Sequence, residues 1–210
     1  MLHLTLLGDS VFDNRAYING AADVAAHLRA LLPAPSAVTL CAVDGSTTFD
    51  VGHQFDRVPS AATHLFLSLG GNDALLNADL LNLPVRSTAE ALDLFRDRRE
   101  SFSQSYGHAL EGLIDLGRPV FVCTIYNGNL AQPAAARAPV ALALFNDVIL
   151  RTALRFGVHV IELRSVCTEP RDYANPIEPS GSGGKKIAEA IVRALDPSNL
   201  RPGRVTKITT

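Results

Sequence analysis

Short apolar runs alternate with longer segments of helical periodicity along almost the whole chain, and this alternation restricts the possible folds more than any other feature. The short runs are rich in Val, Leu and Thr, whereas the longer segments repeat apolar residues every three or four positions. Strands that alternate with helices in this way pair in parallel within one sheet, with the helices covering both of its faces. The pattern therefore predicts a three-layer α/β/α fold around a five-stranded parallel sheet.

The pattern also sets the expected boundaries of the elements. Strands are expected at residues 2–8, 36–43, 63–71, 119–126 and 158–163. Helices are expected at residues 20–32, 87–116, 139–156 and 182–195. Ser87 and Glu90 have the spacing of a capping box, which favours the start of the longest helix there. Residues 127–138, which join a strand to its helix, are the candidate for a mobile element.

The chain shows neither an internal repeat nor a linker, so residues 1–195 are expected to form a single domain. Residues 196–210 are expected to form a loose C-terminal tail. The sequence leaves the oligomeric state open.

Charge and apolar content exclude several classes of partner. The net charge is −2, and the basic residues are interleaved with acidic ones, so there is no basic patch for nucleic acid or anionic lipid. The apolar runs are shorter than the roughly 20 residues that span a bilayer. The start "MLHLTLLGDS" lacks the basic and long apolar regions of a signal peptide, so a cytoplasmic location is expected.

The cysteines do not have the spacing of a metal site. Cys41, Cys123 and Cys167 each lie beside apolar residues, and no CxxC or Cys/His pair occurs. They are therefore expected to be buried free thiols, with no bound metal.

Three of the expected strands are followed directly by short polar motifs. Ser10 ends "LLGDS" after the first strand, Gly45 lies in "VDGSTT" after the second, and Asn72 lies in "LGGNDAL" after the third. The carboxyl ends of parallel strands meet at one edge of a sheet, so the three residues should face one cleft. A serine hydroxyl beside main-chain and Asn N–H groups suits acyl transfer, in which the hydroxyl attacks a carbonyl and the N–H groups bind the oxyanion. Each motif alone also fits a simple turn or helix cap.

In their order and spacing, the three motifs resemble the sequence blocks of the GDSL or SGNH hydrolase family, a group of flavodoxin-like serine esterases. The resemblance covers residues 2 to about 195. It implies that Ser10 is the nucleophile and that Ser10, Gly45 and Asn72 form the oxyanion hole. It further implies a small carboxylic ester or an O-acetyl group as the substrate, with no need for a metal or cofactor.

The last block of that family is altered in this chain. The family pattern has Asp, two residues, His, commonly Pro, and then a glycine before the closing helix. Aligned on it, "NPIEPSGSGG" places Asn175 at the Asp position and Glu178 at the His position. Glu178 is then the expected proton acceptor, although a carboxylate is a weaker base than imidazole unless burial raises its pKa. Asn175 is expected to orient the Glu178 carboxylate by donating a hydrogen bond.

The histidines are poorly placed to replace Glu178. Three of them begin expected strands, at the edge opposite Ser10 and roughly 20 Å or more away: His3, His64 and His159. His53 follows Gly45 by eight residues, which puts it about 12 Å from the cleft if the intervening residues are helical.

Two alternatives to a serine esterase remain open. The chain could be a catalytically silent protein that keeps the oxyanion pocket for a carboxylate or acyl ligand, with "NPIEPS" serving only as a turn. It could also be a hydrolase in which Glu178 activates water while Ser10 only binds the substrate.

Overall fold

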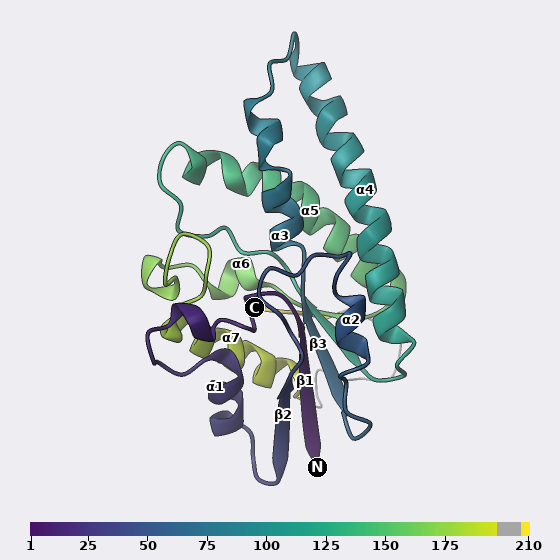
Figure 1. Ribbon diagram of the computed structural model, residues 1–210, viewed down its shortest axis with the longest axis vertical. Helices are drawn as coiled ribbons and strands as arrows, with labels where there is room; N and C mark the ends of the chain where they lie inside the picture. The colour runs from purple at the N-terminus through teal and green to yellow at the C-terminus, as the bar shows by residue number, and fades with distance from the viewer. Residues whose placement is uncertain (197–206) are drawn as a thin grey trace.

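A computed structural model describes residues 1–196 and 207–210 of the chain (Figure 1). Its six strands all run parallel, in the order β2-β1-β3-β4-β5-β6. The strands are β1 (Leu2–Gly8), β2 (Ser36–Leu40), β3 (His64–Ser68), β4 (Val120–Cys123), β5 (His159–Ile161) and β6 (Ile208–Thr209). The helices are α1 (Val24–Leu31), α2 (Gly52–Phe55), α3 (Gly71–Leu76), α4 (Thr88–Ile114), α5 (Ala134–Phe156), α6 (Leu163–Val166) and α7 (Gly181–Ala194). Short 3-10 helices lie at Arg15–Tyr17, Ala78–Asn82 and Pro170–Asp172.

The period-two alternation of side chains along the strands gives each face of the sheet its own core. Leu4 and Leu6 of β1 pack with α1 and α7, whereas Leu7 packs with α4 and α5 on the other face. Figure 1 shows α1 and α7 together on one side of the strands and α2 and α4 on the other. The expected three-layer α/β/α fold is confirmed.

The sheet and the C-terminal segment differ from the expectation. β6 adds a sixth strand beside β5, and it lies within 196–210, which the sequence predicted to be a loose tail. The main-chain N–H groups of Val160 and Glu162 donate to the carbonyls of Lys207 and Thr209, each at 2.8 Å. A strand of two residues is too short to show a period, so β6 could not be predicted from the sequence. Residues 197–206 of the predicted tail lie outside the described residues, and the assignment of 1–195 to a single domain stays a prediction.

α5 begins at Ala134, five residues before the expected start, so it includes the second half of the 127–138 segment. Pro139, which was taken as the first helical residue, lies inside the helix. Proline in a helix costs one main-chain hydrogen bond, but residues 134–138 are four alanines and one arginine, which favour helix strongly.

Cys41, Cys123 and Cys167 are buried free thiols, as predicted. In the part of the chain that the structure describes, His, Cys, Asp and Glu side chains do not gather into a group of three that could hold a metal ion. Among residues 1–196 and 207–210, no helix combines the length and the apolar character needed to cross a membrane.

The sheet reverses its direction of growth at β1, which lies between β2 and β3. In sheets of this kind, the loops that follow the two strands beside such a point separate and leave a crevice. Gly8 ends β1 with φ +112°, opposite Ser68 of β3. A Cβ atom on Gly8 would lie 1.7 Å from the Ser68 carbonyl oxygen, so only glycine allows the two strands to approach this closely.

Gly8→Ala is expected to lower the free energy of unfolding by roughly 3 kcal/mol more than Gly20→Ala does. Both glycines have positive φ, +112° and +84°, so both substitutions introduce the strain of that conformation. A Cβ on Gly20 meets nothing within 4 Å, so only Gly8→Ala adds the clash with Ser68. Urea denaturation followed by circular dichroism measures both variants. Equal losses of stability in the two variants would mean that β1 and β3 move apart to accommodate a Cβ at position 8 without loss of free energy.

Candidate active site

Ser10 lies on a tight turn directly after β1. The N–H of Asp9 donates to the Ser68 carbonyl at 3.0 Å, and Asp9 Oδ1 accepts from the N–H of Val11 at 3.2 Å. Ser10 is 7% exposed, and its own N–H donates to no described residue. Buried main-chain N–H groups are rarely left unpaired, so this one is available to bind an oxyanion.

The turn after β2 carries Gly45 at φ +81°. On either side of it, the N–H of Asp44 donates to Asp13 Oδ2 at 3.1 Å and that of Ser46 donates to the Val43 carbonyl at 3.2 Å. The Gly45 N–H has no acceptor among the described residues. A Cβ on Gly45 would meet no atom within 4 Å, so glycine is favoured here by the backbone conformation and not by crowding.

Asn72 lies in the first turn of α3, after Gly70 in the left-handed conformation. Its amide Nδ2 donates to the Ser46 carbonyl at 3.0 Å, which leaves the second amide hydrogen free for a ligand. The next residue, Asp73, accepts from the hydroxyl of Thr48 at 2.6 Å and from its N–H at 3.2 Å. The loops after β2 and β3 are therefore tied together beside Ser10.

Gln54 of α2 connects these loops to β1. This role of Gln54 was not predicted from the sequence. Its Oε1 accepts from the Gly8 N–H at 2.7 Å, and its Nε2 donates to the Gly8 carbonyl at 2.8 Å and to Ser46 Oγ at 3.1 Å. The side chain is 2% exposed. Gln54 thus satisfies both main-chain groups of Gly8 as a neighbouring strand would, a role that no sequence spacing reveals.

Glu178 lies beside Ser10 and is 6% exposed. Burial raises the pKa of its carboxyl, a hydrogen bond with the Ser10 side chain lowers it, and repulsion from Asp44 raises it further; the net direction is upward. Its Oε2 is buried and has no hydrogen-bond partner among the described residues. A carboxylate in this state is a stronger base than an exposed one, as the sequence analysis required of Glu178.

The main chain around Glu178 is held from several sides. Asn175 Oδ1 accepts from the N–H groups of Ile177 and Glu178, at 2.9 and 2.8 Å. The Tyr126 hydroxyl donates to the Ile177 carbonyl at 2.6 Å, and Asn14 Nδ2 donates to the Pro179 carbonyl at 3.2 Å. The loop is therefore fixed before any substrate binds.

Asn175 does not act as expected. It was predicted to donate to the Glu178 carboxylate, but its carbonyl oxygen accepts from the main chain instead. An aspartate oxygen accepts in the same way in such turns, so Asn fills the position without adding a charge next to Glu178.

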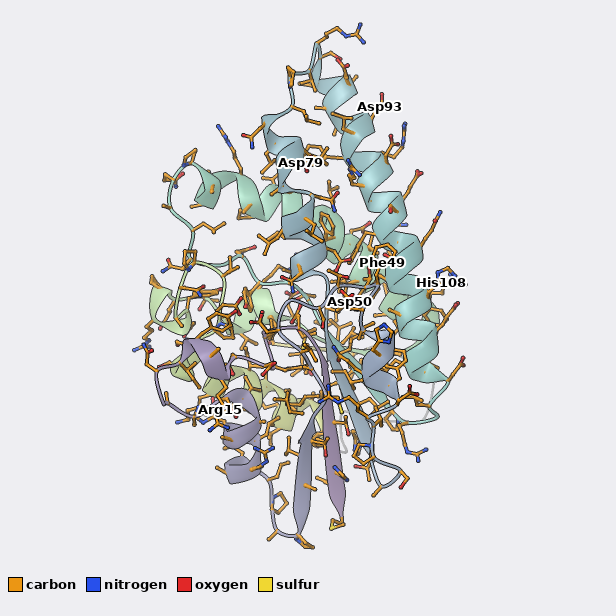
Figure 2. All side chains as sticks on the ribbon, in the orientation of Figure 1. Arg15, Phe49, Asp50, Asp79, Asp93 and His108 are labelled. Carbon is orange, nitrogen blue, oxygen red and sulfur yellow. The ribbon has the colours of Figure 1, made fainter. Side chains whose placement is uncertain are left out.

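The histidines lie away from this cleft. His64 and His159 are the first residues of β3 and β5, and His3 is the second residue of β1, at the opposite edge of the sheet. His53 is exposed on α2. His108 points away from the sheet on the outer side of α4 (Figure 2). Among the described residues that line the pocket containing Ser10, there is no histidine.

Ser10, Asn72 and Glu178 line one pocket of about 300 Å³, and Asp9 lies beside them. Gly45 is not among the lining residues, so the structure brings together Ser10, Asn72 and Glu178 in this pocket but not Gly45. From this polar end the pocket continues between α3, α4 and α5. Figure 1 shows the N-terminal parts of α4 and α5 projecting with α3 beyond the sheet.

The comparison with protein families gives one match: residues 6–183 fit the model of the GDSL-like lipase/acylhydrolase family. No curated protein matches the chain.

Solved structures share the fold at low sequence identity. An extracellular lipase from Streptomyces rimosus is 18% identical, with a TM-score of 0.68 over 92% of this chain and 99% of that one. A phospholipase A1 from Streptomyces albidoflavus is 16% identical, with a TM-score of 0.70 over 91% and 98% of the two chains. An acetyl-xylooligosaccharide esterase from Geobacillus stearothermophilus is 15% identical, with a TM-score of 0.67 over 93% and 94%.

Asp9 is the second buried carboxyl of the site, and it is 3% exposed. Burial raises its pKa to about 7; hydrogen bonds from Val11 and Ser68 lower the pKa, and the charges of Glu178 and Asp73 raise it. Between the ordinary value of 3.8 and about 7, the folded state holds a proton that the unfolded chain has lost. The resulting stabilisation is complete below about pH 4 and is lost as the pH rises through about 7.

Asp9→Asn, which is neutral at every pH, is therefore expected to gain stability over the wild type as the pH rises. The difference should be small near pH 4 and grow towards about 4 kcal/mol by pH 8, since each pKa unit corresponds to about 1.4 kcal/mol. Urea denaturation across this range measures it. The control is Asp79→Asn, at an exposed position (Figure 2), where the substitution should change the free energy of unfolding by no more than about 0.5 kcal/mol. A flat difference for Asp9→Asn would mean that Asp9 is ionised in the folded state.

Proposed function

Because the chain belongs to the GDSL-like lipase/acylhydrolase family, we propose that it hydrolyses carboxylic esters with Ser10 as the nucleophile and Glu178 in place of histidine as the base. The observation that carries this proposal is that a buried carboxylate with a raised pKa interacts with the Ser10 hydroxyl, while its Oε2 has no hydrogen-bond partner among the described residues. A raised pKa brings the carboxylate closer to the basicity of imidazole.

In the proposed reaction, Ser10 Oγ attacks the ester carbonyl while Glu178 takes its proton. The N–H groups of Ser10 and Gly45 and the free amide hydrogen of Asn72 bind the oxyanion. Glu178 then gives the proton to the departing alcohol oxygen, which leaves an acyl group on Ser10. A water molecule, deprotonated by Glu178, releases the acid and restores the site. Asn175 supports the reaction by holding the main chain of Glu178.

The hydrogen bonds of the site favour this reaction over water attack with a passive serine. Glu178 interacts with the Ser10 hydroxyl directly, and the Ser10 N–H lies unpaired beside it. Proton transfer and oxyanion binding therefore converge on the same serine.

The nucleophile can be identified by mass. Wild type incubated with a p-nitrophenyl alkylphosphonate is expected to gain the phosphonyl mass at Ser10, and Ser10→Ala should lose both the label and at least about 10³-fold of the ester hydrolysis. Ser103→Ala, at an exposed position on α4, is the matched control and should label as the wild type does. Hydrolysis at the wild-type rate by a folded Ser10→Ala variant would show that Ser10 is not the nucleophile. Absence of label and turnover in the wild type would instead favour a silent binding protein.

The catalytic base can be identified from the pH dependence of kcat/KM. In the wild type, kcat/KM should rise with pH above the usual glutamate pKa, because only ionised Glu178 accepts the Ser10 proton and burial raises its pKa. Glu178→Gln should abolish this rise of kcat/KM with pH and should lower kcat/KM by roughly 10²- to 10⁴-fold.

The double variant Asn175→Asp, Glu178→His serves as the positive control for the base. It should regain activity, and its kcat/KM should rise over a pH range centred nearer to about 6.5, the usual pKa of histidine. An unchanged profile in Glu178→Gln would show that Glu178 is not the base.

A further inference from the structure

We propose that the part of the pocket beyond Asn72 binds the acyl chain of the substrate, so that the preferred esters carry a medium-length aliphatic acid on a small polar alcohol. The inference rests on the proposed function and names its substrate class. It replaces the small carboxylic ester or O-acetyl group expected from the resemblance by an ester whose acyl chain is long enough to fill the pocket.

The walls of this region leave space for an aliphatic chain. On α5, Ala134, Ala138 and Ala141 follow one another at helical spacing and line the pocket with small side chains. Opposite them, Leu75 of α3 and Leu80 of the following 3-10 helix are also lining residues. An acetyl group held at Ser10 would leave these apolar walls in contact with water.

Three polar side chains of this region have partners within the protein and are not available to bind a sugar. The Thr124 hydroxyl donates to Glu162 at 2.6 Å, and Asn77 Nδ2 donates to the Asp73 carbonyl at 2.8 Å. Arg99 pairs with Asp147 of α5 at 2.9 Å. Arg98 and Asn127, which also line the pocket, are exposed at its rim. A hydroxylated group placed among these walls would lose its hydrogen bonds to water without replacement.

The direction of the reaction decides which half of the ester enters this region. The departing alcohol oxygen receives its proton from Glu178, so the alcohol leaves on the Glu178 side. The groups near that side are polar: Asp44 is exposed, its charge raises the pKa of Glu178, and it accepts from the Tyr17 hydroxyl at 2.5 Å. The acyl chain then extends the other way, past Asn72 to Leu75 and α5.

The first test compares two substrate series. From p-nitrophenyl acetate to the octanoate, kcat/KM should rise at least tenfold, because each methylene buried in an apolar site contributes up to about a fourfold gain. From ethyl to octyl acetate, where only the alcohol lengthens, kcat/KM should stay within about threefold. A rise in the alcohol series, or a flat acyl series with acetate turned over, would overturn the proposal while leaving the esterase function intact.

The second test fills the pocket. Ala141→Phe should lower the ratio of kcat/KM for octanoate over acetate at least tenfold. Ala143→Phe, exposed on the same helix and outside the pocket lining, should leave the ratio within about twofold. Equal ratios in the two variants would show that the chain binds elsewhere.

A binding measurement separates the two proposals if no ester is hydrolysed. Calorimetry should find sodium octanoate bound at least tenfold more tightly than sodium acetate by the wild type, and this preference should be lost in Ala141→Phe. Octanoate binding without ester turnover would support the proposed acyl-chain pocket and reject the proposed esterase activity. Equal affinities for the two acids would reject the acyl pocket.

Discussion

The contact between the ends of β1 and β3 is the constraint on which the site depends. Gly8 approaches the Ser68 carbonyl so closely that no side chain fits, and the next N–H, that of Asp9, donates to the same oxygen. This pairing ends β1 and turns the chain so that Ser10 follows at once. Gln54 completes the arrangement by bonding to both main-chain groups of Gly8 and to Ser46, whose carbonyl holds Asn72. One continuous network therefore connects the turn that carries Ser10 to Asn72.

The electrostatics of the site differ from those of a serine paired with imidazole. Asp9, Asp73 and Glu178 are buried carboxyls, and burial raises the pKa of each. Each ionised carboxylate increases the cost of ionising its neighbours, so the charge on Glu178 depends on the protonation of Asp9. An uncharged residue at position 175 fits this setting, because Asn175 holds the loop by accepting main-chain hydrogen bonds without adding another negative charge.

Much of the fold and part of the site could be predicted from the sequence. Apolar runs and helical periods report burial directly, which is why β1 and the order of the elements were predicted correctly. Ser10, Gly45 and Asn72 were predicted to face one cleft because strand ends converge, and Glu178 was added from its place in the family's last block. The structure brings Ser10, Asn72 and Glu178 together in one pocket. The start of α5 was predicted wrongly because proline, here Pro139, is common at the first position of a helix. β6 was missed because two residues are too few to show a strand period. Gln54, Ser46 and Asn14 act through contacts between distant segments, and no local pattern encodes such contacts.

The pocket walls and the reactive groups come from different parts of the chain. Ser10 and Glu178 lie on loops and Asn72 lies in the first turn of α3, whereas Ala134, Ala138 and Ala141 belong to α5, which takes no part in the described hydrogen bonds around Glu178. A replacement on that face of α5 therefore changes the volume of the pocket without removing a side chain that holds the main chain around Glu178.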